Sequence, residues 1–461
     1  MKIFEVLQEN SGKENTPTAK LKKPGEKKFK ISRPDRPSSR RGREERKSRL
    51  SEAVSRTHMT HLEDLVFYQG YNGAKQALNY LASVTDMLSG NSNKRAKVTT
   101  KWDGAPAIIA GTDPKDGKFF VTTKHAMFAK TPRLSKTPKD IEKNHPDVMK
   151  GDELVSKQGL RDKFKTALNE SKKLNFDGIL HGDFMFSKND LKEQTIDGEN
   201  YIIFKPQEIT YAVPADSDLA KDILAADIGI VWHTQYTGGP EIEDMTTQYG
   251  VVAPQGNKKV WSEDATYKDL TGIATLTANE TNIVKNGVEK LANIITKISP
   301  GKFNAVMKNK EFIKYIEPFI NQKIRAGEAQ VENPTAFLKE FMDYYDDRMQ
   351  AEIDKLKTGI EGPSGQARVQ KIEANKKFIE DNSNILLAIL GVYKQIIQLK
   401  QILIGKLSKV EGIGTFYETE SGYEVADPEG FVAIDRIGNA VKLVDRLEFS
   451  RRNFLAKKGW S

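Results

Sequence analysis

The segment VTTKWDG, residues 98–104, has the pattern of a short strand that ends in a tight turn. Its first residues are β-branched, which favours an extended strand, and the Asp103-Gly104 pair favours a turn. Lys101 therefore ends the predicted strand, with its amine exposed beside the turn. Strand patterns follow at 107–110 (AIIA) and 119–123 (FFVTT). A Lys-x-Asp-Gly string is a weak signal alone, so its meaning depends on the rest of the chain.

The remainder of the chain combines strand patterns with a long helical region. Strand patterns recur at 178–186, 201–211, 228–233, 414–416, 430–434 and 440–444. Apolar residues at helical spacing fill 60–88 and much of 270–410. We therefore predict an α+β fold with mixed or antiparallel sheets. Residues 59–265 and 411–461 would form one domain, and 266–410 a helical insertion.

Composition narrows the classes of protein. The 461-residue chain is 38% hydrophobic, which suits roughly two to three ordinary domains. It contains no cysteine, so disulfides and Cys-ligated zinc are excluded, and a cytoplasmic setting is expected. The most apolar helical stretch, 385–407, is interrupted by Lys394 and Lys400, so we predict no membrane span.

The positive charge is concentrated near the N-terminus. Residues 10–58 carry eight lysines and eight arginines against six acidic residues, with few apolar ones. Such a segment cannot bury enough apolar surface to offset chain entropy, so we predict a disordered basic arm. It would bind nucleic acid through phosphates, without sequence preference. A solubilising linker is the alternative interpretation.

Several residue types needed for nucleotidyl transfer accompany Lys101. Attack on the α-phosphate of a nucleoside triphosphate requires a neutral amine, cations around the phosphates, and carboxylates for a divalent metal. Lys101 is the candidate amine, and the chain contains candidates for the cations and the carboxylates as well. Strand-end carboxylates are more commonly ordinary solvated residues, so it is their combination with Lys101 that favours this chemistry.

The order of these segments resembles the covalent nucleotidyltransferase superfamily of ATP-dependent ligases, RNA ligases and mRNA capping enzymes. KWDG (101–104) resembles the first motif, whose lysine becomes nucleotidylated, and GDFMF (182–186) resembles the third. YIIF (201–204) resembles the segment whose aromatic ring stacks on the base. EGFV (429–432) and AVKLV (440–444) are similar to the fourth and fifth motifs.

The resemblance implies a ligase adenylation-type domain that uses ATP and Mg²⁺. Lys101 would be the nucleophile, with Lys442 and Asp103 as further catalytic residues. Glu429 and Asp183 would support the metal. The nucleotide would be bound by Lys101, Gly104, Lys124, Asp183, Phe204, Glu429 and Lys442, with Tyr211 as the alternative to Phe204. The three histidines near the predicted site, His125, His181 and His233, are expected to be structural.

The sequence also departs from the family pattern. Asp183 replaces the more usual Glu, no basic residue follows closely after the first motif, and Arg446 is outside the usual spacing for the second basic residue of the fifth motif. Two functions therefore stay open. One is an ATP-dependent polynucleotide ligase, and the other is an inactive nucleic-acid-binding or virion-internal protein with the same fold. Only 19 residues follow Lys442, too few for an appended oligonucleotide-binding barrel, so an RNA ligase-like protein is favoured over a DNA ligase.

The first nine residues, MKIFEVLQE, resemble the capsid-targeting peptides of T4-like phage internal proteins. This resemblance implies a phage protein located in the infected host cytoplasm or inside the virion. An amphipathic start that packs on the folded protein explains the same residues.

Overall fold

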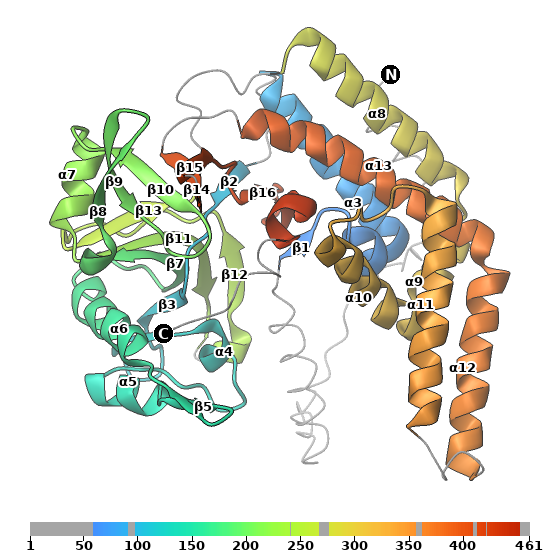
Figure 1. Ribbon diagram of the computed structural model, residues 1–461, viewed down its shortest axis with the longest axis horizontal. Helices are drawn as coiled ribbons and strands as arrows, with labels where there is room; N and C mark the ends of the chain where they lie inside the picture. Colours follow the sequence, from blue (N-terminus) through green and yellow to red (C-terminus); the bar gives the residue numbers. More distant parts are fainter. Residues whose placement is uncertain are drawn as a thin grey trace, which may run out of the picture. The chain divides into compact units, whose positions relative to one another are not determined.

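The computed structural model describes residues 59–90, 97–239, 241–266, 276–355, 362–408, 413–420 and 422–451. The predicted targeting peptide (1–9) and basic arm (10–58) lie outside these residues. The described chain is a mixed α+β structure, as the sequence predicted, with three multistranded sheets and a set of long helices (Figure 1).

The four-stranded sheet contains the segment with which the sequence analysis began. Its order is β1 (Thr60–His61), β17 (Ala440–Leu443), β16 (Gly430–Ile434) and β2 (Lys97–Lys101). Strand β16 is antiparallel to both β17 and β2, whereas β1 is parallel to β17. This sheet joins strands from before and after the long helical region of the chain.

The six-stranded sheet contains the strand patterns predicted at 107–110, 119–123, 178–186 and 228–233. Its order is β12 (Thr246–Tyr249), β11 (Ile228–Thr237), β7 (Ile179–Ser187), β3 (Ala107–Thr112) and β4 (Phe119–Thr122), and β13 (Val260–Asp264) pairs with β11. Helices α5 (Pro138–Asn144) and α6 (Gln158–Ser171) pack beside each other, and α6 contacts β4 and β11 (Figure 1). Phe164 of α6 is fully buried in one core with Phe184 and Trp232. Smaller elements are α4 (Lys124–Met127), the hairpin β5 (Val148–Lys150) and β6 (Glu153–Val155), η2 (Lys188–Asp190) and η3 (Ile242–Asp244).

The five-stranded sheet differs from the sequence prediction in one respect. Its order is β15 (Gly422–Val425), β14 (Gly414–Thr419), β10 (Thr210–Pro214), β9 (Glu199–Phe204) and β8 (Lys192–Ile196), with α7 (Asp218–Ala225) packed against β10. The predicted strand at 201–211 is therefore two antiparallel strands, β9 and β10. Pro206 lies in the turn between them, where the missing N–H of proline breaks no strand pairing.

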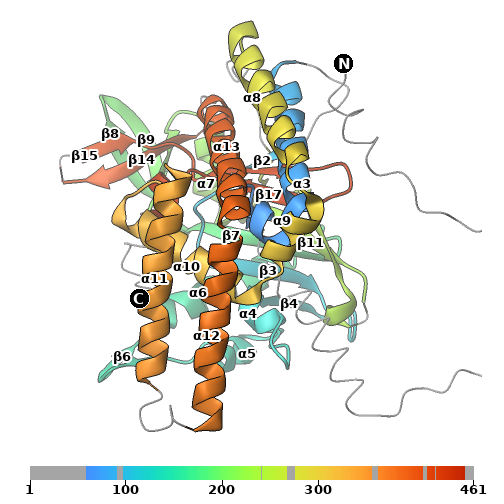
Figure 2. The same ribbon diagram turned by 90° about the vertical axis from the view of Figure 1, so that its right-hand side faces the viewer.

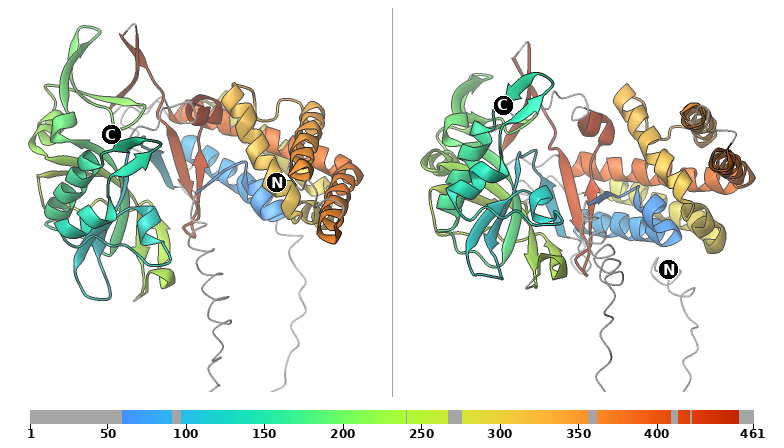
Figure 3. Two further views of the ribbon diagram at one scale, coloured as in Figure 1. Left: turned by 60° about the horizontal axis from the view of Figure 1, so that its bottom comes forward. Right: turned by 90° about the horizontal axis from the view of Figure 1, so that it is seen from below.

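The helical body consists of one helix from the N-terminal side and six from the predicted insertion. These are α3 (Leu65–Leu88), α8 (Ala278–Lys297), α9 (Pro300–Met307), α10 (Lys310–Ala326), α11 (Pro334–Asp354), α12 (Pro363–Asp381) and α13 (Ser383–Leu407). Helices α11 and α12 run side by side (Figures 2 and 3). Helix α3 packs on α8, α9 and α13, so it belongs with the insertion rather than with the sheets. This helix is kinked at Gly70, where φ is 60°.

Among the described residues, α13 is the one helix long and apolar enough to cross a membrane by length and composition. It contacts α3, α8, α9, α11 and α12 and buries residues such as Ile389 and Leu403. Packing within the helical body therefore accounts for its apolar character.

Candidate functional site

A cavity of about 260 Å³ lies between the four-stranded and six-stranded sheets. The sheets are joined beside it by Ala265, whose amide donates to the Trp232 carbonyl of β11 and whose carbonyl accepts from the Thr100 amide of β2. The residues lining one side are Met59, Thr99, Lys101, Val432 and Lys442, and those lining the other include Ala107, Lys124, His181, Asp183, His233, Tyr236 and Tyr249. Four of the predicted site residues therefore line the cavity, namely Lys101, Lys124, Asp183 and Lys442.

Lys101 reaches the cavity because of the alternation of side chains along β2. It lies two residues after Thr99, and residues separated by two share one face of a strand. Lys101 pairs with Gly430 of β16, which directly follows Glu429. The Lys101 ammonium forms an ion pair with the Glu429 carboxylate, and the two side chains are 26% and 8% exposed. The predicted nucleophile and the predicted metal-binding Glu are thus in contact.

The ion pair determines the protonation of the proposed nucleophile. Burial lowers the pKa of Lys101, but the Glu429 carboxylate and, more weakly, Asp183 and Asp103 outweigh it, so the pKa is raised. Burial raises the pKa of Glu429, against the effect of Lys101. Lys101 is therefore an ammonium ion in the free protein, and it becomes a nucleophile only after losing a proton.

Two further lysines line the cavity. Lys442 lies on β17 opposite Val432, which pairs in turn with Thr99, so these three residues form a row across one face of the sheet. Burial, followed by repulsion from Lys101, lowers the pKa of Lys442 to about 8. Burial also lowers the pKa of Lys124 at the start of α4. Three buried or half-buried lysines around one small cavity make it suited to a polyanion.

Asp183 enters the cavity from β7, opposite Ala107 of β3 and Val231 of β11. Its carboxylate lies 3.5 Å from Nε2 of His233. Gly104 packs directly against it, since a Cβ at residue 104 would lie 2.5 Å from Asp183 Cβ. Gly104 therefore permits a close approach of the turn after β2 to β7, and nothing larger fits.

Asp103 does not line the cavity. It is buried, and its Oδ2 accepts hydrogen bonds from the backbone amides of Glu208 (2.8 Å) and Ile209 (3.0 Å). Its own amide donates to the Tyr211 hydroxyl at 2.7 Å. The predicted catalytic role is therefore replaced by a structural one, in which Asp103 fixes the turn between β9 and β10 behind Lys101.

The predicted base-stacking role of Phe204 needs correction. Phe204 is 1% exposed and lies in a core with Tyr211, Phe186 and Trp261. Tyr211, the alternative, is also buried, and its ring stacks on Trp102 with centroids 5.1 Å apart. Neither lines the cavity, because this face of β9 and β10 points into the core between sheets. Trp102 both packs on this core and lines the cavity.

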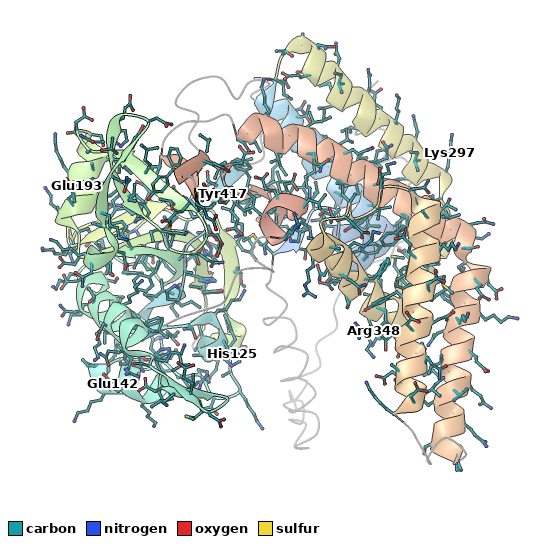
Figure 4. The ribbon with its side chains drawn as sticks, viewed as in Figure 1. His125, Glu142, Glu193, Lys297, Arg348 and Tyr417 are labelled. Atoms are coloured by element: carbon teal, nitrogen blue, oxygen red, sulfur yellow. The ribbon has the colours of Figure 1, made fainter. Side chains whose placement is uncertain are left out.

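The aromatic wall of the cavity comes from two histidines that were expected to be structural and two tyrosines that were not singled out in the sequence. His181, His233, Tyr236 and Tyr249 all line it. The His181 and His233 rings are 4.6 Å apart, and Nδ1 of His181 is 3.3 Å from the Tyr236 hydroxyl. His125, in contrast, is exposed on α4 (Figure 4). Simple alternation along β11 would place His233 and Tyr236 on opposite faces of the strand. A register shift between Trp232 and Thr234 brings both to the cavity, so the sequence contained no local signal for this wall.

The carboxylates around Lys101 fit a magnesium ion that is completed by a substrate. The described residues contain no group of three or more His, Asp or Glu side chains placed to hold a metal by themselves. Mg²⁺ commonly binds through one or two carboxylates together with substrate phosphates and water. Glu429 and Asp183 both act electrostatically on the Lys101 ammonium, so they provide two such carboxylates at a position already occupied by a positive charge.

Residues 56–458 match the family of unknown function DUF6267, so the chain belongs to this family. Comparison with curated proteins and with solved structures gave no match.

Proposed function

For this member of the DUF6267 family, we propose an ATP-dependent polynucleotide ligase of the RNA ligase-like type, in which Lys101 carries the AMP. One observation supports it above the others. A lysine ion-paired to a buried glutamate lines a cavity that also contains Lys442, Lys124 and Asp183. The amine, cations and carboxylates that nucleotidyl transfer needs are therefore within one pocket.

The first step is attack of Lys101 on the α-phosphorus of ATP. The neutral Nζ forms a nitrogen–phosphorus bond, and the bond from this phosphorus to the bridging oxygen of the β-phosphate breaks, releasing pyrophosphate. Lys101 loses one proton to water before the attack and one after it. Mg²⁺ held by Glu429 and Asp183 would neutralise charge on the phosphates and weaken the hold of Glu429 on the ammonium.

The later steps transfer AMP and seal the strand. An oxygen of a 5′-phosphate attacks the AMP phosphorus, and the nitrogen–phosphorus bond to Lys101 breaks. A 3′-hydroxyl then attacks the activated 5′-phosphate and expels AMP. Lys442 and Lys124 stabilise negative charge on the phosphates throughout, and positioning and electrostatics supply most of the catalysis.

The experiment is covalent labelling. Protein incubated with [α-³²P]ATP and Mg²⁺ should retain label on a denaturing gel, and Lys101→Ala should retain none. Lys118→Ala, at a surface lysine with a side chain 71% exposed, is the matched control and should label normally. Label retained by Lys101→Ala would refute Lys101 as the nucleophile, and label from GTP alone would indicate capping chemistry. Nicked RNA and nicked DNA, offered to the labelled protein, then identify the acceptor.

One observation favours the alternative, a non-catalytic protein that binds nucleic acid or lies inside a virion. Arg446, the nearest candidate for a second basic residue after Lys442, does not line the cavity. Its guanidinium instead contacts the buried Asp64 at 3.3 Å. Absence of label from every nucleotide in the wild-type protein would select this alternative.

A further inference from the structure

A buried ionic cluster connects the helical body to the four-stranded sheet. It consists of Glu63, Asp64, Lys400 and Arg446. Lys400, on α13, is 1% exposed, and its ammonium donates to both carboxylate oxygens of Glu63 at 2.8 Å. Glu63 follows β1 and is fully buried. A charged pair without solvent at this depth requires a specific arrangement of its surroundings.

Two backbone contacts link this pair to Lys442. The third hydrogen bond of Lys400 goes to the carbonyl of Val444, at 2.9 Å, two residues beyond Lys442. On the other side of the pair, the Leu62 amide donates to the Lys442 carbonyl at 3.1 Å, directly before Glu63. Lys400 and Glu63 therefore hold both the strand that carries Lys442 and its neighbour β1.

The rest of the cluster extends the connection to other helices. Arg446 contacts Asp64 at 3.3 Å and donates to Asn321 of α10 at 2.7 Å. The Tyr393 hydroxyl of α13 donates to Asp64 at 2.9 Å. Helix α13 thus contacts the chain shortly after Lys442, at Val444, and the segment after the neighbouring strand β1, at Asp64. Helix α10 contacts the chain at Arg446.

Stability alone is a poor reason to bury such a pair. Removing two charges from water costs about as much as their attraction returns, and apolar replacements of similar volume are often neutral or stabilising. The pair does, however, fix the local geometry. If either Lys400 or Glu63 moved, the other would be left as a buried charge without a partner. The geometry that it fixes is that of β17.

We infer that Lys400 is a positioning residue for Lys442, so that the helical body forms part of the phosphate-binding machinery. This inference rests on the proposed function, because it assigns Lys442 to the phosphates. Lys400 does not line the cavity, and it acts through Val444 and Glu63.

The test replaces the pair by apolar residues of similar length, Glu63→Met with Lys400→Met, which leaves no unpaired charge. The matched control is a second ion pair of the same helix, Lys406 with Glu280 of α8 at 3.0 Å, replaced by Glu280→Gln and Lys406→Met. Glu280→Gln keeps the capping pattern of α8. We expect the Glu63/Lys400 double variant to unfold at a temperature similar to wild type but to self-label about tenfold to a hundredfold more slowly. The control pair should label normally.

A second readout is independent of catalysis. Competitive acetylation followed by mass spectrometry measures the pKa of Lys442, which should move from about 8 toward the usual lysine value in the double variant as Lys442 leaves its buried position. If wild type never labels, the proposed function fails, and this measurement still tests the positioning. A folded double variant with wild-type labelling and an unchanged Lys442 pKa would overturn the inference.

If the double variant does not fold, the inference is tested on the wild-type protein instead. Inorganic pyrophosphate at millimolar concentration is the probe, and hydrogen exchange is the measurement. Binding at Lys442 should slow amide exchange around Lys400 in α13. Slower exchange confined to the cavity strands, with none in α13, would refute the connection.

Discussion

Lys101 and Glu429 form an ion pair from neighbouring antiparallel strands, with Glu429 directly before the residue that pairs with Lys101. The same carboxylate holds a proton on the proposed nucleophile and is the proposed ligand for Mg²⁺. The free protein is therefore in an unreactive state. Binding of metal and triphosphate would compete for Glu429 and release the amine.

Glu429→Gln should separate these two effects. Loss of the carboxylate lowers the pKa of Lys101, because burial is then opposed only by Asp183 and Asp103. Acetylation of Lys101 at pH 8 should therefore become several-fold faster relative to the exposed Lys302, measured by mass spectrometry. Self-labelling from ATP should fall by about two orders of magnitude, since a metal ligand is missing. If acetylation of Lys101 fell together with labelling, Glu429 would not be the carboxylate that keeps Lys101 protonated.

The binding of polyphosphate should depend on pH through Lys442. The pKa of Lys442 is lowered to about 8 in the folded protein, mainly by burial. Its cation therefore costs stability below pH 8, and this cost disappears as the pH rises from 8 toward the usual lysine pKa. Above pH 8 Lys442 is increasingly neutral, so an anion that binds the ammonium form can bind only if Lys442 first takes up a proton. The affinity for the anion should therefore be constant below pH 8 and fall by up to about tenfold per pH unit above it.

Calorimetric titration with pyrophosphate in buffers of different ionisation enthalpy measures this proton uptake. Lys442→Met should bind more weakly at pH 7 and lose the pH dependence above 8. An unchanged slope in this variant would assign the titration to another group.

The strands, and the position of Lys101 at a strand end, were predictable because their signals are local. A run of three β-branched residues shortly before an Asp-Gly turn places Lys101 at a strand end whatever the rest of the chain does. The pairing of Lys101 with Glu429 was predictable only through the family resemblance, since one sequence contains no record of which distant strands are neighbours.

The failures have physical causes at particular residues. Phe204 and Tyr211 are aromatic residues on strands, but which face of a strand meets a ligand depends on the sheet packed against it, and here that face is core. Arg446 is paired with Asp64, which lies 382 residues earlier in the sequence, so no local pattern indicates this contact. Helix α3 has the amphipathic pattern of any packed helix, and this pattern does not specify that its partners are α8 and α13.

The third prediction concerns the aromatic residues that line the cavity, which do not include Phe204. Phe204→Leu should destabilise the protein by about 1–3 kcal/mol, as a loss from a packed core, and leave nucleotide affinity unchanged. Tyr249→Leu, at a half-buried residue of the cavity wall, should lower nucleotide affinity about fivefold to fiftyfold through lost stacking on the base. Fluorescent ATP binding and thermal unfolding measure the two effects. The reverse pattern would restore Phe204 to the site.

The contact of Gly104 with Asp183 gives the last prediction. A methyl group at residue 104 would lie 2.5 Å from Asp183 Cβ and 2.9 Å from Met185 Sδ. Gly104→Ala must therefore push the turn away from β7, at a cost of about 1–3 kcal/mol. Since Lys101 precedes this turn and Asp183 faces it, a displacement of about 1 Å should slow self-labelling by about a hundredfold.

Gly405→Ala is the matched control. Gly405 is exposed on α13, and a Cβ there would have no neighbour within 4 Å. This variant should be slightly more stable than wild type, because alanine favours a helix over glycine by about 1 kcal/mol, and it should label normally. Wild-type labelling by Gly104→Ala would show that the spacing between Lys101 and Asp183 is not critical, and would remove Asp183 from the proposed site.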